Sequence, residues 1–160
     1  MTGLTLSNLT VGYRSGRHVT KVLSEVTGSV AAGQMIGRGG TNGAGKSTLL
    51  RSVAGLQPSL AGQVELNGTP TSRMSRRQVA QALSTVLTDR VSVARLTCRD
   101  VVSLGRHPHS GIGGRLRPHD HAVIDESLTA VGAADLAEAC IGELSDGQRQ
   151  RVMGACALAH

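Results

Sequence analysis

The stretch from Gly40 to Ser47 constrains this chain more than any other part, because it matches Gly-x-x-x-x-Gly-Lys-[Ser/Thr] at every fixed position. In this pattern the glycines let the backbone curl, so that successive N–H groups point inward at phosphate oxygens. The lysine, Lys46, reaches the terminal phosphates, and the hydroxyl of Ser47 ligates Mg²⁺. The sequence therefore predicts a phosphate-binding loop with a strand before it and a helix after it.

The residues on both sides of this loop support that prediction. Residues 34–39 are expected to form the entering strand, and apolar residues at helical spacing over 49–54 predict a helix that ends at Gly55. Arg38 and Gly39 are unusual in such a strand, since buried parallel strands read as runs of Val, Ile or Leu. A buried guanidinium without a partner is costly, so Arg38 must pair with a carboxylate, reach solvent or weaken the site.

Further elements are expected from apolar periodicity and turn residues. They are antiparallel strands over residues 4–13 and 22–30, a strand over 63–66 before the turn Asn67-Gly68, a helix over 75–83 and a buried strand over 83–87. From residue 34 to residue 87, the expected strands and helices therefore alternate.

The second half is expected to be mainly helical. Thr97 and Asp100 form a capping box, and apolar residues over 124–131 mark one face of a helix. Between these helices, residues 105–118 are rich in Gly, Pro and His and are expected to form a mobile loop. A last helix begins near Asp146.

Composition narrows the classes of function. The chain has no Phe, no Trp and a single Tyr, at position 13, so this aromatic needs its own explanation. No apolar run reaches the roughly 20 residues that span a bilayer, and the start does not resemble a leader peptide, so a cytoplasmic protein is expected. Cys98, Cys140 and Cys156 lack the spacing of a disulfide framework or a zinc site. The net charge of +6 comes from scattered residues, which favours a solvated surface over contact with nucleic acid or anionic lipid.

A second motif lies far downstream of the loop. Leu144-Ser145-Asp146-Gly147-Gln148 closely resembles the L-S-G-G-Q signature of the ABC ATPase family, with Asp146 in place of the first glycine. A phosphate-binding loop, a helical segment and then this signature is the order of parts in that family. The chain thus resembles, over essentially its whole length, the ATP-binding subunit of an ABC transporter.

This resemblance implies an α/β fold of the P-loop NTPase class, with an N-terminal antiparallel β subdomain and an inserted helical subdomain. A single ATP-binding domain would consist of the β subdomain and loop core over residues 1–90, the helical subdomain over 91–144 and the signature helix over 145–160. In the family, the strand that carries the Mg²⁺-binding Asp and the Glu that polarises water follows this helix. The expected domain is therefore incomplete at its C-terminal end, poorly stable, and slower in ATP hydrolysis by about 10²- to 10⁴-fold.

The resemblance also implies roles for individual residues. Tyr13 stands where the family places an aromatic on the adenine ring; an ordinary strand aromatic is the alternative. Thr88 replaces a glutamine that contacts the metal and the attacking water, and its shorter side chain cannot reach them in the same way. Lys46 and Thr88 are the expected catalytic residues. The signature would contact ATP held by the opposite subunit of a homodimer. The expected nucleotide-binding residues are Tyr13, Gly40, Thr41, Asn42, Gly43, Ala44, Gly45, Lys46, Ser47, Thr48, Ser145, Gly147 and Gln148, with ATP and Mg²⁺ as cofactors and Ser47 as the metal ligand.

Residues 104–109, Leu-Gly-Arg-His-Pro-His, are similar to a segment in ATPases of importers for iron-siderophore, haem and cobalamin. The similarity implies an ATPase that drives uptake of an iron chelate from the cytoplasmic face of the membrane. Its partners would be transmembrane permease subunits and, indirectly, a substrate-binding protein, with no nucleic acid. A nucleotide-binding module without efficient hydrolysis and an ABC ATPase acting on DNA stay open as alternatives. A metal site at His107, His109, His119 and His121 is the alternative function for those histidines.

Several positions depart from the family pattern. Gly154, Cys156 and His160 replace the Ile, Arg and Gln that usually end the signature helix. Together with Arg38 and Gly39, these residues indicate a degenerate or altered copy of the domain.

Overall fold

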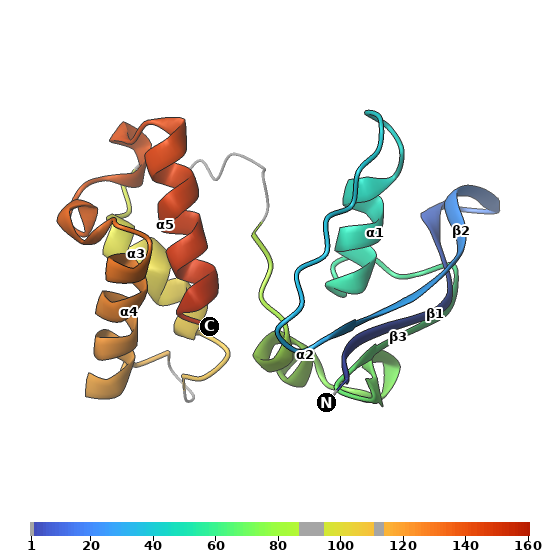
Figure 1. Cartoon of the computed structure of the whole chain (residues 1–160), viewed down its shortest axis with the longest axis horizontal. Helices are drawn as coiled ribbons and strands as arrows, with labels where there is room; N and C mark the ends of the chain where they lie inside the picture. The colour runs from blue at the N-terminus through green and yellow to red at the C-terminus, as the bar shows by residue number, and fades with distance from the viewer. Residues whose placement is uncertain (1, 87–94, 111–113) are drawn as a thin grey trace. The chain divides into compact units, whose positions relative to one another are not determined.

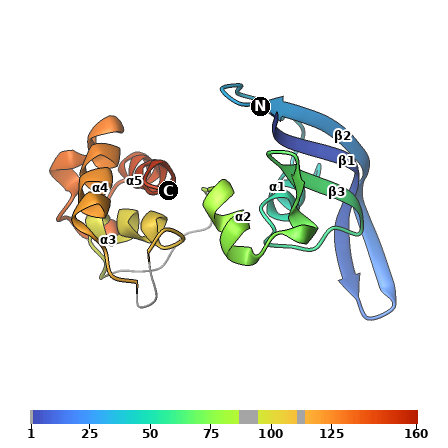
Figure 2. The same cartoon turned by 90° about the horizontal axis from the view of Figure 1, so that it is seen from below.

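The computed structural model describes residues 2–86, 95–110 and 114–160. The chain divides into two compact units, Met1–Leu83 and Ser84–His160. The first unit contains the sheet with helices α1 and α2, and the second contains helices α3, α4 and α5 (Figures 1 and 2). No helix within the described residues is long and apolar enough to cross a membrane.

The first unit is built on a four-stranded antiparallel sheet in the order β2-β1-β3-β4. Its strands are β1 (Thr2–Ser15), β2 (His18–Ala31), β3 (Ala61–Leu66) and β4 (Thr69–Pro70). The long pair β1–β2 confirms the predicted antiparallel strands. The predicted turn at Asn67 and Gly68 is confirmed, with φ angles of 51° and 78°, and in the structure it joins β3 to β4 as a two-residue hairpin.

Two helices complete this unit. Helix α1 (Lys46–Val53) buries Leu49 and Val53 against Leu9, Val11 and Val64 of the sheet. Helix α2 (Arg76–Ala82) begins at a capping box and follows the short 3-10 helix η1 (Thr71–Arg73). Both helices were predicted close to these bounds, since apolar spacing and capping residues are local signals.

Two predicted strands are wrong. Residues 34–40 have no regular structure and are exposed; Met35 is 98% exposed, and Arg38 reaches solvent without entering a buried strand. Residues 83–86 also form no strand, while Leu87 lies outside the described residues. A strand needs a neighbour for its N–H and C=O groups, and the four strands of the described sheet pair only among themselves.

The second unit is helical. Its elements are α3 (Cys98–Ser103), η2 (Leu104–Arg106), α4 (Pro118–Ala130), η3 (Ala134–Leu136), η4 (Ile141–Glu143) and α5 (Asp146–Leu158). Their apolar faces share one core, in which Val102, Ile124 and Val152 are fully buried. The capping box at Thr97 and Asp100 is confirmed, with N–H···O distances of 3.0 and 3.1 Å.

The irregular loop predicted over residues 105–118 is wrong at both ends. At its start, Gly105 packs in η2 so closely against α5 that an added Cβ would lie 2.2 Å from the Cys156 carbonyl oxygen. At its end, Pro118 opens α4, where its missing N–H costs no hydrogen bond. Residues 111–113 lie outside the described residues. Long-range packing against α5 therefore overrides the local loop signal at Gly105.

Candidate functional site

The loop that was predicted to bind phosphate turns into α1 at Gly45. This residue is the N-cap of the helix, with φ 77° and ψ 12°, a left-handed conformation that favours glycine. A Cβ at Gly45 would also lie 2.6 Å from Cγ1 of Val22 in β2. Glycine at position 45 is thus required both by the turn and by close packing of the loop on the sheet.

The N-terminus of α1 is not capped by a side chain. Gly45 offers none, and the first turn contains no acidic residue. Helices α2, α3 and α5, in contrast, begin with capping boxes at Ser75, Thr97 and Ser145. The first N–H groups of a helix have no acceptor within it and carry the positive end of the helix dipole. This end of α1 can therefore receive an anion.

Lys46 lies across the loop that precedes α1. Its Nζ donates to the carbonyl oxygens of Gly40 and Thr41, both at 2.7 Å. The amide of Ala44 donates to the same Thr41 oxygen at 3.2 Å and closes the turn. The ammonium group is therefore held at the loop by two backbone carbonyl oxygens. Thr41, Asn42 and Gly43 are exposed, as is Ser47.

The single aromatic side chain of the protein meets the start of α1. The hydroxyl oxygen of Tyr13 lies 3.0 Å from Oγ1 of Thr48, within hydrogen-bond distance. Thr48 is buried, whereas Tyr13 is 52% exposed. The structure thus brings Tyr13, Lys46, Ser47 and Thr48 together in the first unit.

The second motif forms the start of α5. Ser145 is the N-cap: its hydroxyl accepts from the amide of Gln148, while its own amide donates to the Gln148 side chain. Asp146 and Gly147 follow on an exposed first turn, where a carboxylate interacts favourably with the helix dipole. An added Cβ at Gly147 would meet no atom within 4 Å, so the packing of this unit does not require a glycine there.

The other predicted site residues are Thr88 and the histidines. Thr88, predicted to be catalytic, lies outside the described residues. Within the described ranges, no group of three or more His, Cys, Asp or Glu side chains is arranged to hold a metal ion. His109 instead contacts the ring of His160, with a centroid distance of 5.3 Å.

A buried ion pair in the second unit was not found from the sequence. Nε of Arg106 donates to Asp120 at 2.9 Å, and Nη1 donates to the Ala159 carbonyl at 2.9 Å. Asp120 also accepts from the Arg117 amide at 2.8 Å. The hydrogen bond from this amide is the larger cause, and the bond from the Arg106 guanidinium the next, that lower the pKa of Asp120 below its usual range. Asp120 lies three residues after Arg117 at a helix start, the one local signal that could have indicated part of this network.

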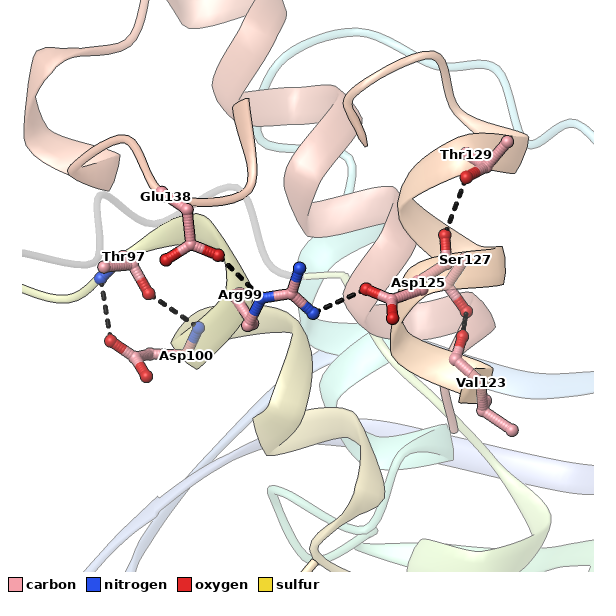
Figure 3. Close-up of polar contacts among 8 residues, drawn as sticks. All are labelled: Thr97, Arg99, Asp100, Val123, Asp125, Ser127, Thr129 and Glu138. Carbon is pink, nitrogen blue, oxygen red and sulfur yellow. Dashed lines mark hydrogen bonds and ion pairs between the residues drawn. The ribbon is translucent and has the colours of Figure 1, made fainter. Parts of the chain in front are cut away.

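Arg99 joins three parts of the same unit (Figure 3). Its guanidinium contacts Asp125 of α4 at 2.5 Å and Glu138, which follows η3, at 2.8 Å. The hydrogen bond to Glu138 is the larger cause, and the bond to Asp125 the next, that raise the pKa of Arg99. The side chain is 36% exposed, so solvent screens these pairs and they add little to stability.

Known proteins are similar to this chain in both sequence and fold. A model of the ABC transporter family matches residues 23–160. An uncharacterised ABC transporter ATP-binding protein of Methanocaldococcus jannaschii is 40% identical over 156 residues, 98% of this chain and 52% of that protein. The iron(3+)-hydroxamate import ATP-binding protein of Bacillus subtilis is 36% identical over 159 residues, 99% of this chain and 58% of that protein. A solved dimeric bacterial ABC transporter cassette matches with a TM-score of 0.81 and 24% identity, over 98% of this chain and 69% of that one.

The chain spans about half the length of the curated relatives it matches, 52% and 58% of the two named above. The likeness to the solved cassette confirms the predicted fold class, an α/β P-loop fold of ABC type with an antiparallel β part and a helical part. The family model covers most of the sequence, including the loop and the second motif. This chain therefore belongs to the ABC transporter family.

Proposed function

We propose that this chain binds ATP with Mg²⁺ as part of the nucleotide-binding subunit of an ABC-type importer. The observation that carries the proposal is the start of α1, where an N-terminus without a side-chain cap lies beside an ammonium group held by two loop carbonyls. Backbone N–H groups and one lysine in this arrangement suit a triphosphate.

Individual roles follow from this placement. Residues 40–45 cradle the phosphates, Lys46 exchanges its loop carbonyls for phosphate oxygens, and the exposed Ser47 hydroxyl ligates Mg²⁺. Tyr13 offers a half-exposed ring beside the loop for stacking on the adenine. Mg²⁺ would neutralise charge on the phosphates, and with Lys46 it would stabilise the charge that develops during hydrolysis. Thr88 remains a proposed catalytic residue.

The signature supports a homodimer in which ATP is bound between two copies. Ser145 and Gly147 lie on the exposed start of α5, a helix end that attracts anions. Gln148 is already bonded to Ser145, so these two residues would present one rigid turn to the partner's γ-phosphate. On this proposal residues 1–160 act as a single ATP-binding domain.

The transported substrate is proposed from similarity. The Bacillus subtilis relative is an iron(3+)-hydroxamate import protein, which supports uptake of an iron chelate by the transporter to which this chain contributes. Permease subunits would span the membrane, with this subunit on the cytoplasmic face and a substrate-binding protein acting indirectly.

The central test is Lys46→Ala, measured as affinity for Mg-ATP by calorimetry. Loss of charge-assisted hydrogen bonds worth about 1.5–3 kcal/mol predicts affinity about 10- to 150-fold weaker. Lys21→Ala is the matched control, because Lys21 is the other lysine of the chain and is exposed on β2. Equal affinities for the wild type and Lys46→Ala would contradict the proposal. Phosphate release tests hydrolysis separately, since hydrolysis also needs a positioned base.

A further inference from the structure

The helix that begins at the second motif is held at its far end by residues 104–106. An added Cβ at Gly105 would lie 2.2 Å from the Cys156 carbonyl oxygen, so the backbones of η2 and α5 are in direct contact. Nη1 of Arg106 donates to the carbonyl of Ala159, the C-cap of α5, at 2.9 Å. These two contacts fix the C-terminal end of α5 against η2.

The Arg106 guanidinium serves two helix ends of opposite polarity. The carbonyl groups at the end of α5 carry the negative end of its dipole, which a cation stabilises. Nε of the same guanidinium donates to Asp120 in the first turn of α4, where a carboxylate interacts favourably with the positive end. Arg106 is 9% exposed and Asp120 is 5% exposed, so water competes little for either group. The pair therefore links the end of α5 to the start of α4.

A pair of this kind specifies position as well as stability. A shielded ion pair can often be replaced as a whole by apolar residues of similar volume without loss of stability. The planar guanidinium of Arg106, however, has donors in fixed directions, and here they meet one carboxylate and one backbone carbonyl. Since each acceptor belongs to a different helix, both bonds form in only one placement of α5 relative to α4.

Helix α5 transmits this placement from its end to its start. Its 13 residues span about 20 Å, and the fully buried Val152 lies midway between Ser145 and Ala159. The helix packs beside α3 and α4 in the same unit (Figures 1 and 2). A short helix behaves as a rigid rod about its packed centre. A displacement at Ala159 therefore moves Ser145 by a similar distance in the opposite direction.

We propose that Gly105 and Arg106 are positioning residues for the turn at residues 145–148, which they place through α5. This inference rests on the proposed function and deepens it: the placement of the turn matters for ATP held by a second copy, and not for ATP bound by the loop of the same copy. Hydrogen bonds to phosphate tolerate only small errors in distance. Disturbing the far end of α5 should therefore weaken the contact between copies.

The first measurement follows the turn itself, by amide chemical shifts of the whole chain without nucleotide. Arg106→Lys keeps the charge and loses the planar set of donors, whereas Gly105→Ala pushes η2 away from α5. The amides of Gly147 and Gln148 are expected to shift in both variants, although about 12 Å of helix separates Gln148 from Cys156.

Arg99→Lys is the matched control. Arg99 also pairs with two acceptors of this unit, Asp125 and Glu138, neither of which belongs to α5 (Figure 3). The same replacement at this arginine should leave the amides of Gly147 and Gln148 unchanged.

The second measurement separates the two copies from the single copy. Sedimentation equilibrium with Mg-ATP measures self-association, and calorimetry at low protein concentration measures the affinity of one copy for Mg-ATP. Arg106→Lys and Gly105→Ala are each expected to weaken ATP-dependent self-association about 10-fold, because a misplaced turn loses hydrogen bonds to a charged group. The affinity of one copy for Mg-ATP should change less than about 2-fold. A merely structural role would lower the stability of the second unit without changing the ratio of these two constants.

The inference is overturned if the amides of Gly147 and Gln148 do not shift, if self-association keeps its wild-type strength, or if self-association and ATP affinity weaken equally. A wild-type protein that does not bind Mg-ATP would instead refute the proposed function, and one that binds it without associating would refute the proposed homodimer. In both cases the amide shifts still decide whether Gly105 and Arg106 place the turn. Gly105→Ala decides the question if Arg106→Lys does not fold, since it keeps both groups of the ion pair.

Discussion

The two units of this protein differ in how completely they bury their apolar side chains. Of the described residues, five form the buried core of the first unit and twelve that of the second. Six of the nine exposed large apolar side chains belong to the first unit, among them Met35 and Leu50. The unit that holds the predicted phosphate loop therefore covers its apolar side chains less completely than the helical unit does.

Charge separates the units as clearly as packing does. Residues 1–83 contain nine Lys or Arg and two Asp or Glu, a net charge of +7, while residues 84–160 contain eight and nine, a net charge of −1. Basic residues that look scattered along the sequence thus give an excess of positive charge to the unit with the predicted phosphate loop. The positive electrostatic field of this unit favours the approach of a polyanion such as a nucleoside triphosphate.

The largest expected effect concerns the buried pair of the second unit. Arg106→Met leaves the Asp120 carboxylate without its guanidinium, and breaking a pair that is shielded from solvent in this way is strongly destabilising. Native-state hydrogen exchange of amides in α3, α4 and α5 should show this loss, while amides of the sheet should not. Arg151→Met is the control, since Arg151 is an exposed arginine that donates to the Gly132 carbonyl. Equal losses for the two variants would contradict a special role of the buried pair.

Acidification tests the same network. Because the pKa of Asp120 is lowered in the folded state, its contribution to stability is present above the unfolded value of about 3.9. That contribution disappears as the pH falls through the lower folded value. The second unit should therefore lose stability below about pH 4. Arg106→Met should reduce this dependence without abolishing it, since the bond from the Arg117 amide, the larger cause of the shift, remains.

The next effect compares two leucines, one in each unit. Leu128→Ala removes a side chain that is 1% exposed in the helical core, at an expected cost of about 2–5 kcal/mol to the second unit. Leu50→Ala, on a side chain that is 61% exposed in α1, should change the stability of the first unit by less than about 0.5 kcal/mol. Hydrogen exchange within each unit measures both. A large loss from Leu50→Ala would show that the first unit is better packed than its exposure indicates.

Features that depend on residues close together in the sequence could be predicted, whereas features that depend on distant residues could not. The capping box at Thr97 and the turn at Asn67-Gly68 depend on neighbours within a few residues, and both were predicted. Residues 34–39 precede the phosphate-loop motif, where a strand is expected, but a strand also needs a pairing partner, which no local pattern reveals. Arg106 pairs with Asp120, 14 residues away, and donates to the Ala159 carbonyl, 53 residues away. Neither partner could be predicted from the sequence. The loop over residues 40–47 could be singled out because the spacing of its glycines and the chemistry of its lysine and serine coincide in one short segment, and its binding of phosphate stays a prediction.

The smallest expected effect separates two buried serines. Within the part of the chain that the structure describes, Oγ of Ser52 in α1 is buried without a hydrogen-bond partner. Ser127 in α4 is equally buried, at 6% exposure, but donates to the Val123 carbonyl at 2.7 Å (Figure 3). An unmade hydrogen bond is costly, and alanine is the better helix former, so Ser52→Ala should stabilise the first unit by about 1 kcal/mol. Ser127→Ala removes a satisfied group and should give no such gain. Thermal unfolding and exchange of each unit's amides measure both, and a destabilising Ser52→Ala would mean that water or a ligand satisfies that hydroxyl in solution.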